Sequence, residues 1–304
     1  MHRRAFILSS IAVTAAAGGV SACATMSAPA QPDFVSDRIG VSVEGSGSDV
    51  ILIPGLSSRP AIWDTTAAHL AGRYRVHRVW VSGFAGRPAG ANATGDSVSQ
   101  PVAEEIARYI REQNLERPAV IGHSMGGWIG MVLAARHSES VGRLMVVDMM
   151  PFMGAMFGPP GTTPEQVRPV ADQILAGIRT AAPDARRAMA EQTLAGMIRT
   201  ESLRAAEVEA SLASDSDVSG RAFHELIVTD LRPELANITA PVTVLYVTPT
   251  GAPLTDAQMD GFYQLSYANI PGVRLVRIPD AAHFIMYDNP ARFFAEVDAF
   301  LSPG

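Results

Sequence analysis

Short runs of consecutive apolar residues alternate along this chain with longer stretches of helical pattern. The apolar runs lie at residues 50–53, 76–81, 119–121, 144–147, 242–247 and 273–278. Compact runs rich in β-branched residues are typical of strands buried on both faces. Helices are predicted in between, at residues 102–113, 125–136, 256–269 and 291–301. Strands that alternate with helices predict an α/β protein with a mostly parallel central sheet flanked by helices.

Residues 149–238 break this alternation. They are helical in pattern, rich in Ala, Arg and Met, and contain no β-branched run long enough for a core strand. About 90 residues are too many for a connecting loop in a compact domain. We therefore expect an inserted helical cap at 149–238, between a first core segment at 40–148 and a second at 239–304.

The first residues have the pattern of an export signal. A short basic start with Arg3 and Arg4 precedes an apolar stretch and then small residues, which predicts a signal peptide at 1–22. Residues 20–23, Val-Ser-Ala-Cys, resemble a bacterial lipobox, and the paired arginines resemble a twin-arginine signal. We expect a lipidated Cys23, a flexible tether at 23–39 and a periplasmic protein anchored to an envelope membrane. An ordinary signal peptide with an incidental cysteine, or an uncleaved anchor, are the alternatives.

Composition excludes several classes of protein. All 24 basic residues are Arg, so Schiff-base chemistry on Lys and a phosphate-binding Gly-Lys-Ser/Thr loop are excluded. The formal net charge of −6 and the absence of a basic stripe argue against a nucleic-acid partner. Cys23 is the only cysteine, so the body of the chain has no internal disulfide and no cysteine metal site. We expect no cofactor, no metal and a small-molecule substrate.

The motif that carries chemistry is Gly-His-Ser-Met-Gly at residues 122–126. It directly follows a predicted strand and directly precedes a predicted helix. A serine on such a tight turn takes up a strained backbone conformation, and glycines two residues before and after it let the strand and the helix approach closely. The hydroxyl of Ser124 is then exposed at the N-terminus of a helix, where negative charge is stabilised.

With this motif the chain resembles the α/β-hydrolase family from about residue 40 to the C-terminus, cap included. Three more segments match the family: 53–58 followed by Trp63 resembles the first oxyanion loop, 82–86 the loop after the next strand, and 281–284 the histidine loop. The resemblance implies the α/β-hydrolase fold with the cap above Ser124. It also implies that the backbone N–H groups of Leu56 and Met125 form the oxyanion hole.

Ser124 needs a base, and histidine serves because its pKa lies near working pH. His283, in the segment that resembles the histidine loop, is the expected base. The other six histidines are interpreted as leader, packing, pocket-wall or surface residues: His2, His69, His77, His123, His137 and His224.

The third member of the triad departs from the commonest family pattern. The acid usually follows the strand after the cap, but residues 248–253 contain no carboxylate, and Gly251 occupies the expected place. Asp148, at the end of the predicted strand 144–147, is the expected acid, and Asp256 is the alternative. Asp280 and Asp288 are weaker candidates because the acid must reach the far nitrogen of the histidine.

We therefore expect a serine hydrolase that cleaves a carboxylic ester or lactone through an acyl-enzyme. Methionines of the cap at 149, 150, 153, 156, 189 and 197 could line a pocket for apolar groups or could fill the core of the cap. Two alternatives remain open, because fold does not dictate chemistry. The same scaffold could hydrolyse C–C bonds or amides or act as a perhydrolase, or the protein could be a non-catalytic lipoprotein that binds apolar ligands.

Overall fold

The computed structural model describes residues 34–302 with the exception of 250, 252 and 253. The predicted signal peptide, Cys23 and most of the predicted tether lie outside the described residues. None of the helices in the described part of the chain is both long and apolar enough to cross a membrane.

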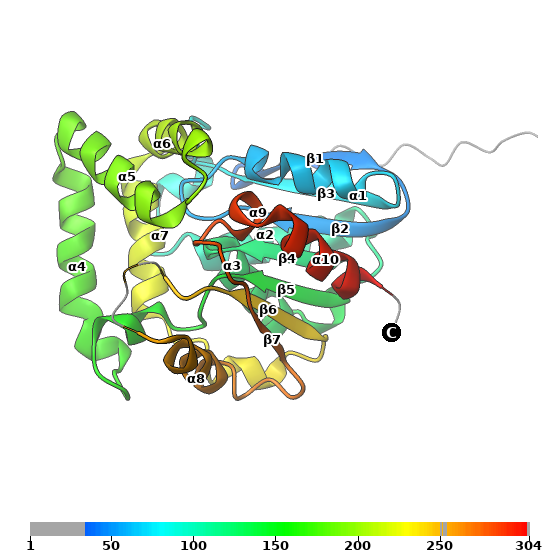
Figure 1. The fold of residues 1–304 in the computed structure, drawn as a ribbon. Coiled ribbons are helices and arrows are strands. Elements are labelled where there is room, and N and C mark those ends of the chain that lie inside the picture. The colour runs from blue at the N-terminus through cyan, green and yellow to red at the C-terminus, as the bar shows by residue number, and fades with distance from the viewer. Residues whose placement is uncertain (1–33, 250, 252–253, 303–304) are drawn as a thin grey trace, which may run out of the picture. The chain divides into compact units, whose positions relative to one another are not determined.

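The described residues form a seven-stranded sheet with the order β1-β3-β2-β4-β5-β6-β7 (Figure 1). The strands are β1 (Ile39–Gly45), β2 (Ser48–Ile53), β3 (Tyr74–Val81), β4 (Ala119–His123), β5 (Arg143–Val147), β6 (Val242–Tyr246) and β7 (Arg274–Arg277). All pairs are parallel except β1 with β3, which is antiparallel. This confirms the predicted mostly parallel α/β fold, whereas the antiparallel edge strand β1 was not predicted.

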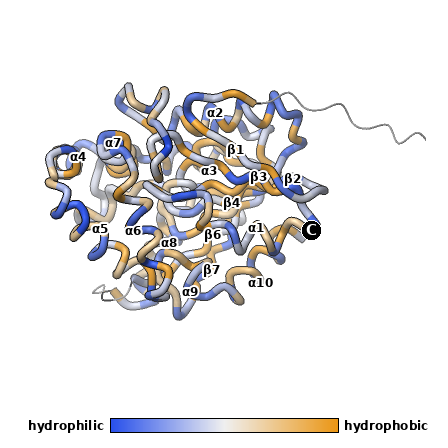
Figure 2. Tube along the Cα trace, turned by 90° about the horizontal axis from the view of Figure 1, so that it is seen from above, coloured by the Kyte–Doolittle hydropathy of each residue, from blue (hydrophilic) through white to orange (hydrophobic). Residues whose placement is uncertain are grey.

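Helices cover both faces of the sheet, and from β2 to β7 the apolar side chains of each strand alternate between two cores. In β2, Ile51 and Ile53 pack with helices α2 (Ser99–Glu112) and α3 (Met125–Arg136), whereas Val50 and Leu52 pack on the opposite side. The opposite core also includes α1 (Asp64–Leu70), α9 (Ile285–Asp288) and α10 (Pro290–Leu301). Figure 2 shows the strands between these two groups of helices, with hydrophobic residues concentrated inside. The two-residue period of a strand explains this division.

Four α-helices between β5 and β6 form the cap (Figure 1). They are α4 (Pro164–Thr180), α5 (Pro183–Met197), α6 (Arg204–Ala213) and α7 (Ser216–Val228). Their hydrogen bonds to loops at the carboxyl ends of the strands include Ser57 Oγ with Ser219 Oγ at 2.8 Å. The cap therefore lies over the edge of the sheet where the predicted catalytic residues are located. A helix after β6, α8 (Asp256–Ser266), completes that edge.

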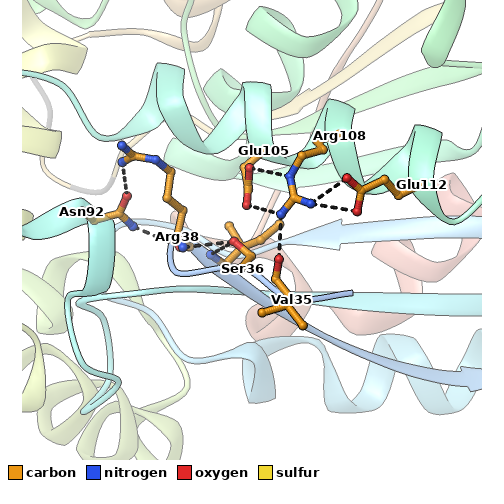
Figure 3. A network of polar contacts seen from close by, with 8 residues as sticks. Val35, Ser36, Arg38, Asn92, Glu105, Arg108 and Glu112 are labelled. Carbon is orange, nitrogen blue, oxygen red and sulfur yellow. Dashed lines mark hydrogen bonds and ion pairs between the residues drawn. The ribbon is translucent and has the colours of Figure 1, made fainter. Parts of the chain in front are cut away.

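The end of the predicted tether differs from expectation, because residues 34–39 belong to the folded body. Phe34 packs edge-on against Tyr109, with ring centroids 4.9 Å apart, and the guanidinium of Arg108 lies 4.3 Å from the centre of the Phe34 ring. Arg38 and Ile39 both donate their backbone N–H to the Ser36 hydroxyl, within the polar network of Figure 3. A single aromatic residue in a polar stretch has no periodicity, so the sequence pattern did not reveal this anchor.

Candidate active site

Ser124 occupies a strained turn between β4 and α3. Its backbone has φ 52° and ψ −124°, a region that residues other than glycine rarely adopt. A Cβ atom on Gly122 would lie 2.2 Å from the carbonyl oxygen of Gly126, and one on Gly126 would lie 2.2 Å from the carbonyl oxygen of Ile53. Both glycines are therefore required for this approach of strand and helix, as the motif predicted.

The loop after β2 passes directly against this turn. A Cβ on Gly55 would lie 3.1 Å from the Cβ of Ser124, which shows how close the two backbones are. Leu56 follows in this loop, and Met125 is the first residue of α3. Among the residues that the structure describes, neither of their N–H groups donates to a protein acceptor. Both amides are thus available for an anionic oxygen next to Ser124.

The strand register places Asp148 beside Ser124. His123 pairs with Val147 in the β4–β5 ladder, so the next residue of each strand, Ser124 and Asp148, lie at the same edge of the sheet. The N–H of Ser124 donates to the carbonyl oxygen of Val147 at 2.8 Å. Asp148 Oδ2 lies 2.6 Å from Nδ1 of His283, which comes from the loop between β7 and α9. The structure therefore brings together two residues that are 135 positions apart.

Two further groups hold the Asp148 carboxylate. Its other oxygen, Oδ1, accepts hydrogen bonds from the Val247 N–H at 3.1 Å and from the Tyr263 hydroxyl at 3.2 Å. Burial, together with the Asp148 charge, raises the pKa of Tyr263 well above its ordinary value, so this phenol stays a donor. Tyr263 lies on α8 and was not identified from the sequence. Its spacing from Tyr267 signals only a helix.

His123 holds the loop of His283 from within the core. Its Nε2 lies 3.0 Å from the carbonyl oxygen of His283 and therefore donates to it. Burial is the main cause that lowers the pKa of His123 well below the ordinary value, so this ring is neutral. A neutral neighbour does not repel a positive charge that forms on His283, whose ring centroid is 4.6 Å away. His123 thus supports the site without competing for its proton.

The other candidate acids are engaged elsewhere. Asp256 accepts hydrogen bonds from Thr248 at 2.7 Å and from Arg277 at 2.6 Å. The side chain of Asp280 is 87% exposed. Asp288 accepts hydrogen bonds from the backbone N–H groups of Arg199 and Thr200, which belong to the cap, and of Ala282, which precedes His283. Among the described residues, Asp148 is the carboxylate that contacts His283.

The remaining described histidines have partners far from this site. His69 contacts Asp298, His77 contacts Asp49 and Tyr109, His137 contacts Glu104, and His224 contacts Asp172. Within the described residues, no three His, Cys, Asp or Glu side chains converge as ligands of a metal ion would.

A cavity of about 220 Å³ lies between the cap helices and the loop after β2, and neither Ser124 nor His283 is among the residues that line it. Leu56, Ser57 and Ser58 of the β2 loop form one wall, and Phe284, next to His283, forms another. Residues of all four cap helices or their connections close it. Of the six cap methionines named above, Met189 lines this cavity, whereas Met149 and Met150 are buried in the core.

Comparison with known proteins places this chain in a family. The sequence profile of the alpha/beta hydrolase family matches residues 50–297. A pimeloyl-[acyl-carrier protein] methyl ester esterase of Pectobacterium carotovorum is 28% identical over 265 residues, which cover 84% of this chain and 96% of that one. The corresponding esterase of Vibrio atlanticus is 26% identical over 88% of this chain and 97% of its own length.

Solved structures share the fold. An enol-lactonase of Burkholderia xenovorans has a TM-score of 0.70 and 22% identity, covering 87% of this chain and 96% of its own. An esterase of Exiguobacterium antarcticum has a TM-score of 0.71 and 21% identity, covering 86% and 94% respectively. At these identities the likeness concerns the fold alone. Together with the family profile and the serine turn, it establishes that the chain belongs to the alpha/beta hydrolase family.

Proposed function

We propose that this chain, a carboxylic ester hydrolase of the alpha/beta hydrolase family, cleaves esters or lactones through an acyl-enzyme on Ser124. The observation that carries the proposal is the 2.6 Å contact of Asp148 with His283 at the edge of the sheet where the strained Ser124 turn lies. A carboxylate on Nδ1 keeps the proton of a neutral imidazole on that nitrogen, which leaves Nε2 free to accept one.

In the proposed reaction, Ser124 Oγ attacks the ester carbonyl carbon and gives its proton to Nε2 of His283. The imidazolium is stabilised by Asp148 and passes that proton to the departing alcohol oxygen, which leaves the acyl group on Ser124. Water then repeats the cycle: His283 takes a proton from it, the hydroxide adds to the acyl carbon, and Ser124 leaves with the proton. The products are a carboxylic acid and an alcohol.

The N–H groups of Leu56 and Met125 would donate to the oxyanion of each tetrahedral intermediate. One donor of this kind contributes about 2.7–4 kcal/mol to lowering the barrier. The N-terminus of α3 adds a favourable dipole at the same place.

The substrate we propose is an ester or lactone with a small, mainly apolar group in the cavity. Its volume of about 220 Å³ is below the roughly 300–1,000 Å³ of sites that enclose drug-sized ligands. The named relatives act on the methyl ester of an acyl group, and one structural neighbour is a lactonase. These names support an ester with a small alcohol or a cyclic ester as the first substrates to test.

The test combines covalent labelling with hydrolysis. A fluorophosphonate probe should label the purified protein and should not label the Ser124→Ala variant, and p-nitrophenyl esters of graded chain length should be hydrolysed fastest at short chains. Equal labelling of both proteins would refute a nucleophilic role of Ser124. If the protein hydrolysed amides or C–C bonds but no esters, the proposed ester chemistry would be wrong, and the same fold would carry out another reaction.

For the N-terminal segment we propose export and lipid anchoring through Cys23. The basic start, the apolar stretch and the lipobox-like residues 20–23 support it. Expression of the full chain in a bacterial host with labelled palmitate should give a labelled membrane protein, and Cys23→Ser should abolish the label. An unlabelled chain that retains Met1 would refute the proposal.

A further inference from the structure

Glu207 is a buried carboxylate in the wall of the substrate cavity. It lies on α6, is 3% exposed, and lines the cavity together with Leu56 and Phe284. The proposed reaction gives it no role. Glutamate is rarely buried unless it is paired, so its position needs a physical reason.

Both protein partners of Glu207 bind the same oxygen. Oε1 accepts from Arg59 Nε at 3.1 Å and from the Tyr287 hydroxyl at 3.0 Å. The other oxygen, Oε2, is buried and has no hydrogen-bond partner among the described residues. A buried charged oxygen without a donor is costly. The structure therefore leaves one carboxylate oxygen of a residue that lines the cavity without a donor among the described residues.

The two partners of Glu207 offset part of the effect of its burial. Burial raises the pKa of Glu207 above its ordinary value, and the Arg59 guanidinium and the Tyr287 hydroxyl oppose that shift without cancelling it. The other charged side chain of the cavity wall, Arg186, donates to the carbonyl oxygen of Ser214 at 3.2 Å. It therefore has a partner of its own. The hydroxyls of Ser57 and Ser219 are hydrogen-bonded to each other.

We propose that Oε2 of Glu207 accepts a hydrogen bond from the substrate, so that the enzyme selects esters that carry a hydroxyl or N–H donor over plain alkyl esters. This inference rests on the proposed function, because it concerns the same cavity and the same reaction. It refines the substrate class from a small apolar ester to one with a single polar donor beyond the ester group. Sites built to hydrogen-bond a substrate group discriminate strongly against the analogue that lacks it.

The experiment compares matched esters at pH 8. The acyl series is methyl hexanoate, methyl 6-hydroxyhexanoate and methyl 5-oxohexanoate, and the alcohol series is propyl and 3-hydroxypropyl butanoate. We expect kcat/KM to be about 10- to 100-fold higher for the hydroxyl ester in at least one series, as for a hydrogen bond to a charged group. The oxo ester, which only accepts, should be the poorest substrate of the acyl series.

Two variants separate recognition from support of the fold. Glu207→Leu should abolish the preference for the hydroxyl ester. In Glu207→Gln the amide oxygen should stay with Arg59 and Tyr287. The NH₂ group, which donates, then takes the place of the acceptor Oε2, so kcat/KM for the oxo ester should rise relative to that for methyl hexanoate. The matched control is Glu209→Leu on the same helix, whose carboxylate is 66% exposed and contacts Arg187. It should leave all preferences unchanged.

A purely structural role of Glu207 predicts a different result, namely an equal loss for every ester. Equal losses, or no hydroxyl preference of the parent enzyme in either series, would overturn the assignment. Fluorophosphonate labelling of Ser124 in each protein shows whether only the Glu207 inference fails or the proposed function fails as well. Labelled protein that hydrolyses esters without this selectivity overturns the Glu207 inference alone, whereas a parent protein without label or turnover overturns the proposed function as well.

Discussion

Replacing Asp148 by Asn tests the catalytic pair most sharply, because the structure dictates how the new amide would be oriented. Oδ1 of Asp148 accepts from two donors, the Val247 N–H and the Tyr263 hydroxyl. In the Asp148→Asn variant the amide oxygen must take that place, so the amide NH₂ group faces Nδ1 of His283. Since NH₂ only donates, His283 must then carry its proton on Nε2.

This tautomer cannot accept the proton of Ser124. Loss of the charge-assisted hydrogen bond alone, at about 1.5–3 kcal/mol, corresponds to roughly 10- to 150-fold in rate. The wrong tautomer adds to this, and the same substitution in a serine protease triad lowers kcat about 10⁴-fold. We therefore expect kcat of Asp148→Asn to fall at least ~100-fold and up to ~10⁴-fold, with KM little changed.

The assay is steady-state hydrolysis of a short p-nitrophenyl ester by the parent, Asp148→Asn and Asp256→Asn. Asp256 is the matched control, because it bonds Thr248 and Arg277 and does not contact His283. Its variant should retain kcat within a few-fold of the parent. If Asp148→Asn kept more than a tenth of the activity, or if Asp256→Asn were the more damaging change, the assignment of the acid would be wrong.

Three further predictions concern the support of the site. Tyr263→Phe removes one of the two donors to Asp148 Oδ1. A hydrogen bond to a charged group contributes about 1.5 kcal/mol, so kcat should fall about 10-fold. An unchanged kcat would show that the Val247 N–H suffices. Gly126→Ala places a Cβ 2.2 Å from the carbonyl oxygen of Ile53 and should prevent folding or lower Tm strongly. The control Gly72→Ala, with open space around the new Cβ, should be tolerated. Equal Tm values of the two variants would contradict the turn geometry. His123 has a folded-state pKa well below 6.5, so the unfolded chain binds a proton that the folded protein does not, and stability is lost as pH falls below about 6.5. Below about pH 6.5 its contribution to the free energy of unfolding should decrease with falling pH by at most about 1.4 kcal/mol per pH unit. Urea denaturation between pH 7 and pH 5 measures this slope, and a His123→Gln variant with the same slope as the parent would argue against it.

Features that depend on neighbours in the chain were predictable from residues alone. The helix expected at 125–136 is observed as Met125–Arg136, and the expected apolar run at 50–53 lies in β2. The strained turn at Ser124 follows from Gly122 and Gly126, whose missing Cβ atoms permit the close approach. Edge strand β1 was not predicted because it contains no continuous apolar run. Its apolar residues Ile39, Val41 and Val43 alternate with glycine or polar residues, and all its residues after Ile39 are half-buried or exposed.

Contacts between distant segments had no such local signal. From the residues alone, Asp148 and Asp256 were both plausible partners of His283, and the choice came from the β4–β5 register and the path of the loop after β7, which set a 2.6 Å contact across 135 residues. The roles of Tyr263 and Glu207 likewise exist because helices from other parts of the chain pack beside the site. Steric contacts between close neighbours and the period of the side chains depend only on consecutive residues. The pairing of the Asp148 carboxylate with the His283 ring depends on how the whole sheet and cap assemble.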